Sequence, residues 1–248
     1  MKFIFDVDGT LTLSRKKIDS DFLSFFLEFA SNYDVYLVTG SNREKTIEQI
    51  THEMYCACKR VYNCAGNDVY EQDTIFFRND WELPNDARSF LQDELDYSVF
   101  PIRTGTHIEK RPGCVNFSIL GRGATFEERD VYKEWDRDRD ERIDIATRFN
   151  DRFPELYAFV GGETGVDISS KGSDKGQIIR DFSEGDELHF FGDRMDVNGN
   201  DYPLAKEVEK LGGYNHCVKD YNDTWRRLTE YLTGTSPLDD TEKLRYYT

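Results

Sequence analysis

The amino-acid sequence predicts an α/β fold, with a Rossmann-like parallel-sheet core, helices on both of its faces, and an inserted α+β domain. Near both ends of the chain, short apolar runs alternate with helical segments, which is the pattern of a parallel sheet with crossover helices. Between residues 81 and 170 that alternation is lost. We therefore expect a core domain of residues 1–80 and 171–248, with residues 81–170 inserted as a second domain.

Each core element follows from its residue pattern. Lys2–Val7 is too short for a helix and is typical of a buried parallel strand. A helix is expected to follow, capped by Asp19 or Ser20, because large apolar residues recur there at helical spacing. The remaining core elements are predicted as strands 35–38, 61–64, 188–192 and 215–218, helices 44–50, 203–211 and 223–232, and an edge hairpin of 69–70 with 74–77.

The insert has a different pattern. We expect antiparallel strands at 106–110 and 114–120, with helices at 86–95 and 126–149. The charge run from Asp136 to Arg142 alternates in sign like a solvated helix face and lacks the glycine of a calcium loop. The tail 234–248 is polar and expected to be loosely held.

Composition limits the classes of function. The 248-residue chain has a formal net charge of −16, which disfavours non-specific binding to nucleic acid or to an anionic membrane. No apolar run is long enough for a membrane span, and the N-terminus enters a strand without a signal peptide. The five cysteines are odd in number and scattered, as expected of reduced thiols. A cytoplasmic protein is therefore expected.

Polar side chains stand at the carboxyl ends of three predicted strands. Asp6 and Asp8 follow the first strand, Thr39 the second and Asp193 a late one. Ligands of open α/β sheets bind at this edge, so these side chains are expected to converge. Crowded carboxylates repel one another unless one is protonated or a cation lies between them, and Mg²⁺ is the simplest oxygen-liganded ion to do so. The alternative is that Asp8-Gly9 merely forms a turn.

These residues resemble the motifs of the haloacid dehalogenase superfamily. FDVDGTLT resembles its nucleophile motif DxDGT, VTG at 38–40 its second motif, Lys175 in GSDKG its third, and GDRMDVNGND at 192–201 its fourth. The resemblance implies that Asp6 is a nucleophile that forms an aspartyl-phosphate and that Asp8 is the general acid and base.

The same resemblance implies the ligands. Mg²⁺ would be held by Asp6, the Asp8 backbone carbonyl and Asp193, with either Asn200 or Asp201 acting directly or through water. The phosphoryl oxygens would be bound by Thr39, the Gly40 amide and Lys175.

The insert carries a second resemblance. The stretch IEKRPGCVNFSILGRGATFEER, from Ile108 to Arg129, is similar to the cap segment of eukaryotic-type phosphomannomutases, and the match continues at Gly161-Gly162 and Val166-Asp167. It implies that Arg111 and Arg122 bind the phosphate distant from the metal, a role that suits the planar arginine fork. Further residues implied at the substrate are Arg15, Asn116 and Asp167. The alternative is that both arginines are ordinary surface residues.

The implied activity is Mg²⁺-dependent phosphoryl transfer on a phosphorylated sugar, interconverting hexose 1- and 6-phosphates. Three positions differ from the family pattern: Leu13 replaces a proline, Thr104 an arginine and Gly165 a serine. Weaker distal binding would favour hydrolysis, so a sugar-phosphate phosphatase is the alternative, and a non-catalytic sugar-phosphate-binding protein a third. If a homodimer forms, the cap is expected to be its interface, by analogy with the family.

The remaining metal-ligating residue types show no recognised spacing. Cys56 and Cys58 are too close together for a zinc knuckle. The four histidines, His52, His107, His189 and His216, include no pair at metal-binding spacing on one helix, and only His107 lies near the cap motif.

Overall fold

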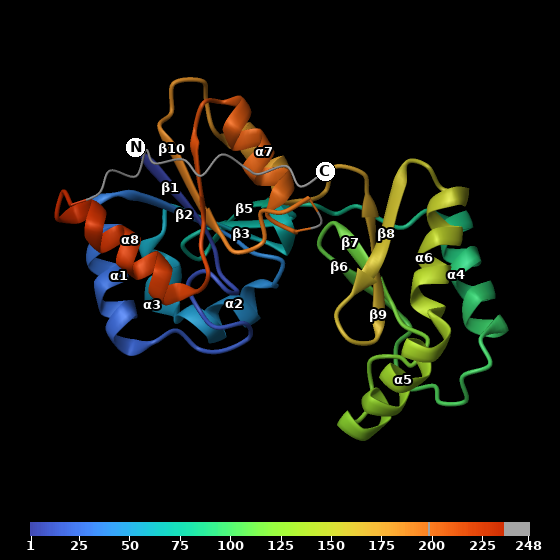
Figure 1. Ribbon diagram of the computed structural model, residues 1–248. Coiled ribbons are helices and arrows are strands. Elements are labelled where there is room, and N and C mark those ends of the chain that lie inside the picture. The colour runs from blue at the N-terminus through green and yellow to red at the C-terminus, as the bar shows by residue number, and fades with distance from the viewer. Residues whose placement is uncertain (198, 236–248) are drawn as a thin grey trace. The chain divides into compact units, whose positions relative to one another are not determined.

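The computed structural model describes residues 1–197 and 199–235, so the predicted loose tail lies almost entirely outside the described residues. The chain forms two compact units (Figure 1). One unit consists of Met1–Arg78 with the chain from Gly172 onward, and the other is Asn79–Lys171.

The first unit is built on a seven-stranded sheet in the order β11-β10-β1-β2-β3-β4-β5. Five strands run parallel, and β4 and β5 form the antiparallel edge. The strands are β1 (Lys2–Asp6), β2 (Asp34–Val38), β3 (Arg60–Asn63), β4 (Asp68–Glu71), β5 (Thr74–Arg78), β10 (Leu188–Gly192) and β11 (Tyr214–Cys217).

Helices cover both faces of this sheet, which confirms the predicted α/β core. Figure 1 shows α1, α3 and α8 on one side and α7 on the other. The helical segments are α1 (Ser20–Asn32), α2 (Arg43–Ile50), α3 (His52–Ala57), α7 (Tyr202–Lys210), α8 (Tyr221–Leu232) and the short 3-10 segments η1 (Cys64–Gly66) and η2 (Lys175–Asp181).

Strand β1 shows why both faces must be covered. Phe3 and Phe5 enter one hydrophobic core together with α1 and α8, whereas Ile4 enters a second core with η2 and α7. Successive side chains of a strand point to opposite faces, so an unbroken apolar strand requires cover on both sides. All three side chains are fully buried.

The sequence left two candidate N-cap residues for helix α1, Asp19 and Ser20. Asp19 is the residue that acts, because its Oδ1 accepts hydrogen bonds from the amides of Asp21 at 2.9 Å and Phe22 at 3.1 Å. These bonds satisfy amides that have no partner within the helix. The helix then buries Phe22, Phe26 and Phe29 against the sheet.

The second unit is a four-stranded antiparallel sheet with helices on one face. Its strand order is β6-β7-β9-β8, and α4 and α6 pack on its apolar side (Figure 1). The elements are α4 (Asn85–Tyr97), β6 (Ile108–Arg111), β7 (Cys114–Phe117), α5 (Phe126–Arg139), α6 (Glu141–Arg152), β8 (Leu156–Gly161) and β9 (Gly165–Ser170). Strands β8 and β9 were not expected from the sequence.

The single helix predicted over 126–149 was wrong. The chain breaks at Asp140, which has a left-handed backbone with φ of 54°, so that α5 and α6 are separate. The Asp136 carboxylate accepts from the backbone amide of Arg142 at 2.9 Å and from its Nε at 2.7 Å. Asp136 is only 7% exposed. The start and end of the charge run therefore hold a corner between two helices and do not form a solvated face.

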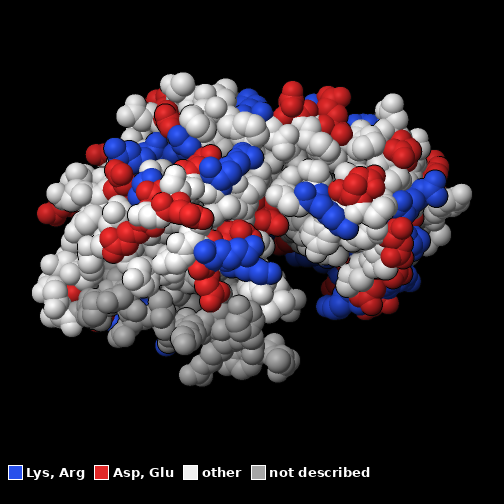
Figure 2. Space-filling model, turned by 90° about the horizontal axis from the view of Figure 1, so that it is seen from above, with Lys and Arg blue, Asp and Glu red and all other residues white. Residues whose placement is uncertain are grey.

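Charged side chains on the surface are mixed in sign. On the face seen in Figure 2, the described Lys and Arg side chains are interspersed with Asp and Glu. Elsewhere among the described residues, charged side chains form ion pairs, such as Arg148 with Glu94 at 2.6 Å and Arg226 with Glu230 at 2.7 Å. Exposed pairs of this kind contribute little to stability. Among the described residues, no helix is both long enough and apolar enough to cross a membrane.

Candidate active site

Three carboxylates converge at the carboxyl edge of the parallel sheet. Asp6 ends β1, Asp193 directly follows β10 and Asp201 directly precedes α7. One carboxylate oxygen of each lies within 4.8 Å of the others. The register explains the approach of the first two, because Phe5 of β1 pairs with Phe191 of β10 and both strands end just beyond that pair. Of the two alternatives for the fourth motif, Asp201 lies in this cluster, whereas Asn200 is exposed.

Lys175 lies between two of these carboxylates. Its Nζ donates to Asp6 Oδ1 at 2.6 Å and to Asp201 Oδ1 at 2.7 Å. Lys175 is 2% exposed, Asp6 is 2% exposed and Asp201 is fully buried. The remaining oxygen of Asp201 accepts from the Arg194 amide at 3.0 Å. Lys175 and Asp201 are therefore held in fixed positions beside Asp6.

Burial dominates the electrostatics of this cluster. It raises the pKa of Asp6 to about 8, with Lys175 opposing the shift and Asp201 adding to it. Burial, together with Asp201, also raises the pKa of Asp193. For Lys175, burial alone would lower the pKa, but the attraction of Asp6 and Asp201 raises it. The ammonium is therefore charged, while the three acids repel one another.

Two glycines make room for these carboxylates. Gly9 has a φ of 81°, and a Cβ on it would lie 2.2 Å from Asp193 Oδ2. A Cβ on Gly192 would lie 2.7 Å from Asp201 Oδ2. Any other residue at either position would displace a carboxylate, so these glycines have a steric function beyond forming a turn.

Mg²⁺ fits this donor set. When Asp6 is ionised, three carboxylates face one ammonium, and a divalent cation would neutralise the excess negative charge. Without a cation, burial favours the protonated form of Asp6. All of the donors are oxygens, as hard cations require. Asp6, Asp193 and Asp201 are the side chains that would hold the ion.

Asp8 is oriented by contacts that the sequence did not reveal. Its Oδ1 accepts from the backbone amide of Arg15 at 2.6 Å and from Gln49 Nε2 at 3.0 Å. Arg15 thus contributes its main chain, which has a φ of 59°, while its side chain is exposed. Gln49, 4% exposed, was missed because a glutamine inside a helix carries no motif signal.

Thr39 and Gly40 lie at the same edge of the sheet. Val38 pairs with Asp6 across the β1–β2 ladder, so the next two residues follow directly beside the carboxylate strand. The buried Thr39 hydroxyl accepts from the Ser41 amide at 3.1 Å. Gly40 is exposed, and a Cβ there would meet no atom within 4 Å. This loop leaves open space above its backbone.

In the second unit, the predicted arginines converge on one acid. Arg111 Nη2 lies 2.6 Å and Arg122 Nη2 2.9 Å from Glu109 Oε2. Asn116 Nδ2 donates to Asp167 Oδ1 at 2.5 Å, and Arg111 Nη1 lies 3.7 Å from the same oxygen. Glu109 was not singled out, although it is the glutamate of the IEKR stretch. Two guanidinium groups held side by side can bind an anion such as phosphate.

The structure bears on two of the departures from the family pattern, at Thr104 and Gly165. Arg103, next to Thr104, donates its guanidinium to backbone carbonyls of the preceding segment, including Ser98 at 2.9 Å and Ile102 at 3.1 Å. It is therefore committed to the local fold. A Cβ on Gly165 would lie 2.6 Å from Asn116 Nδ2, so a serine there would require Asn116 to move.

Comparison with known proteins identifies the family. A sequence model described as eukaryotic phosphomannomutase matches residues 22–234. The chain is 31% identical to a phosphomannomutase of Nicotiana benthamiana, covering 93% of this chain and 94% of that protein. It is 33% identical to one of Arabidopsis thaliana, with coverages of 89% and 92%.

Solved structures share the fold. A haloacid dehalogenase-like hydrolase from Bacteroides thetaiotaomicron superposes with a TM-score of 0.59 at 13% identity, covering 92% of this chain and 98% of that one. The IMP-nucleotidase of Plasmodium falciparum gives 0.58 at 12% identity, with coverages of 95% and 69%. These structures show that the chain shares the fold of a haloacid dehalogenase-like hydrolase. The sequence matches show that it belongs to the eukaryotic phosphomannomutase family and is an enzyme, a phosphotransferase or phosphatase.

Proposed function

We propose that this enzyme interconverts the 1- and 6-phosphates of a hexose, mannose first among them, through an aspartyl-phosphate on Asp6 and with Mg²⁺ as cofactor. The observation that carries the proposal is the convergence of Asp6, Lys175, Asp193 and Asp201 at one sheet edge. The phosphomannomutases among its relatives support the choice of substrate.

The chain's own residues account for the first half-reaction. An ionised Asp6 carboxylate attacks phosphorus, and the bond between phosphorus and the sugar oxygen breaks. Asp8 gives its proton to that leaving oxygen, and its own position is fixed by Arg15 and Gln49. Lys175 keeps Asp6 oriented and, with Thr39 and the Gly40 amide, offsets charge on the phosphoryl oxygens.

The second half-reaction reverses these roles. Asp8, now a base, takes the proton of the acceptor hydroxyl, the hydroxyl oxygen attacks phosphorus, and the bond to Asp6 breaks. When bound, Mg²⁺ supplies charge that lets a phosphate dianion approach a carboxylate. In the second unit, Arg111 and Arg122 bind the phosphate that does not react, and Asn116 and Asp167 bind sugar hydroxyls.

Hydrolysis is the second candidate, and a specific observation favours it. The family's extra arginine is Thr104 here, and the neighbouring Arg103 is committed to backbone carbonyls. A hexose monophosphate held by fewer arginines leaves the phosphorylated enzyme sooner, so water reaches the aspartyl-phosphate more often.

The experiment that tests the proposal follows two products at once. The protein is incubated with Mg²⁺ and mannose 1-phosphate, with and without a hexose bisphosphate activator, and free phosphate and mannose 6-phosphate are measured separately. We expect the 6-phosphate to dominate and the activator to accelerate its formation. Stoichiometric release of free phosphate without isomer would contradict the mutase and support the phosphatase. Absence of turnover of any sugar phosphate would support a non-catalytic sugar-phosphate-binding protein.

Arg122→Ala is expected to raise KM for the sugar phosphate by about tenfold or more, because a charge-assisted hydrogen bond contributes about 1.5–3 kcal/mol. Steady-state kinetics measure the change. Arg148→Ala is the matched control, since Arg148 also forms an arginine–glutamate pair, with Glu94, but lies on a helix of the second unit. Equal KM values for the two variants would show that Arg122 does not bind the substrate.

A further inference from the structure

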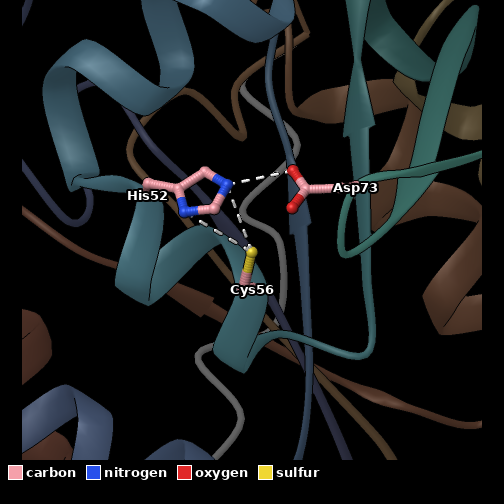
Figure 3. A group of neighbouring side chains, drawn as sticks. All are labelled: His52, Cys56 and Asp73. Atoms are coloured by element: carbon pink, nitrogen blue, oxygen red, sulfur yellow. Dashed lines mark hydrogen bonds and ion pairs between the residues drawn. The ribbon is translucent and has the colours of Figure 1, made fainter.

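Three side chains that can ligate a metal meet at the surface of the first unit (Figure 3). His52 and Cys56 lie one turn apart on α3, so both project from the same face of the helix. Asp73 comes from the turn between β4 and β5. One ligand atom of each lies within 4.8 Å of the others. This cluster shares no residue with the carboxylate cluster.

The spacing of the ligand atoms suits a tetrahedral ion. Bond lengths of about 2.0–2.3 Å place two ligands of tetrahedral zinc roughly 3.3–3.6 Å apart. Cys56 Sγ already lies 3.6 Å from His52 Nε2. His52 Nε2 lies 2.9 Å from Asp73 Oδ1, a hydrogen-bond distance that must widen by about 0.4 Å for both atoms to bind one ion. The half-exposed side chains of His52 and Asp73 allow that adjustment.

We propose that His52, Cys56 and Asp73 form a second metal site, separate from the proposed Mg²⁺ site, that binds a borderline-soft divalent cation, Zn²⁺ foremost. Imidazole, thiolate and carboxylate together are a donor set that zinc accepts and that Mg²⁺, which prefers oxygen, does not. Water completes the fourth position. On binding, the thiol proton goes to solvent and a sulfur–metal bond replaces the S–H bond.

Arg43 is a cation in direct contact with this site, and the geometry accommodates it. Its guanidinium pairs with Asp73 Oδ1 and lies over the ring of Tyr70, at 4.8 Å, and that of Tyr55, at 5.3 Å. A carboxylate has two oxygens, so Asp73 can bind the ion through Oδ1, beside His52, while Arg43 moves to Oδ2. A hydrogen-bonded partner of this kind orients a ligating carboxylate. Thiolate and carboxylate together outweigh the single arginine charge.

The occupied site would add a link between α3 and the β4–β5 hairpin, which the His52–Asp73 contact and the packing of Tyr55 against Tyr70 already join. Because one coordination position goes to water, the ion would exchange more readily than in a site with four protein ligands.

The test uses the full chain, stripped of metal and supplied with excess Mg²⁺. Co²⁺ serves as the spectroscopic probe, because a cobalt–thiolate bond gives a near-ultraviolet charge-transfer band that carboxylate ligands do not give. We expect one equivalent of Co²⁺ to produce the band and Zn²⁺ to abolish it by displacement. Cys56→Ala should lose the band, and Cys217→Ala, at an exposed cysteine on β11, should keep it.

Zinc affinity, measured by competition with a chromophoric chelator, provides independent variants. His52→Gln and Asp73→Asn are each expected to weaken Zn²⁺ binding by about tenfold or more. The proposal is overturned if the parent gives no band, if the band persists in Cys56→Ala, or if all three variants bind Zn²⁺ as tightly as the parent. None of these readouts requires turnover, so the result is independent of the proposed mutase activity.

Discussion

Asp6→Asn is expected to reduce turnover of every sugar phosphate by about 10⁴-fold or more, the scale on which the loss of a nucleophile acts. An amide of the same shape cannot attack phosphorus, so the aspartyl-phosphate does not form. The site loses one negative charge, but Lys175 keeps its contact with Asp201, and the pairs of Arg111 and Arg122 with Glu109 in the second unit are unchanged. Binding of the sugar phosphate should therefore survive where turnover does not.

Two measurements check this prediction. The initial rates of isomer and phosphate formation measure the loss of activity. In the second experiment, the protein is incubated with radiolabelled substrate and quenched with acid. Release of protein-bound phosphate by hydroxylamine then identifies an acyl phosphate. Asp21→Asn, the same change at an exposed position in the first turn of α1, is the matched control and should behave as the parent. Comparable rates in Asp6→Asn and the parent would exclude Asp6 as the nucleophile.

The positions of Asp6 and Asp193 could be predicted because the end of a buried strand can be recognised in the sequence. A buried parallel strand is an unbroken apolar run, so the residue that ends it is identified without a structure. Asp6 and Asp193 end or follow such runs, and the parallel pairing of β1 with β10 places them at one edge. Lys175 and Asp201 follow no such strand, and only the motif resemblance pointed to them.

Other parts could not be predicted because the contacts that determine them leave no local pattern. Gln49 reaches Asp8 across 41 positions of sequence, and nothing in its helix marks it as different. Strand β8 has exposed aromatic residues, Tyr157 and Phe159, on its open face, so the alternation of polar and apolar residues that identifies a half-buried strand is missing. Asp140 breaks a helix without glycine or proline, because Asp136 and Arg142 hold the corner.

The histidines show the same limit. His189 and His216 are 27 positions apart and looked unrelated, yet they lie on neighbouring strands β10 and β11 with His189 Nδ1 3.1 Å from His216 Nε2. His216 is 2% exposed, and its ring stacks on Phe191 with 4.3 Å between centroids. Burial, with added repulsion from His189 and Arg227, lowers the pKa of His216 to about 3. This imidazole is therefore neutral in the folded protein.

Acid should consequently destabilise the fold through His216, and His216→Gln should reduce that effect. The unfolded chain takes up a proton at this residue below its ordinary pKa of 6.5, whereas the folded chain does so only near pH 3. The contribution of His216 is therefore fully present above pH 6.5 and is lost progressively as the pH falls toward 3. Each pH unit in that window costs about 1.4 kcal/mol, or about 2 kcal/mol between pH 6.5 and pH 5.

Urea denaturation between pH 7 and pH 5 measures this slope in both proteins, and titrations common to both cancel in the difference. Asn215→Ala is the matched control: Asn215 is also buried on β11 and donates to the Ala205 carbonyl at 2.8 Å, so its loss destabilises the fold without removing a titrating group. It should lower stability equally at both pH values. Parallel pH profiles for the parent and His216→Gln would mean that His216 takes up its proton in the folded state, and that the paired imidazoles accommodate charge despite their burial.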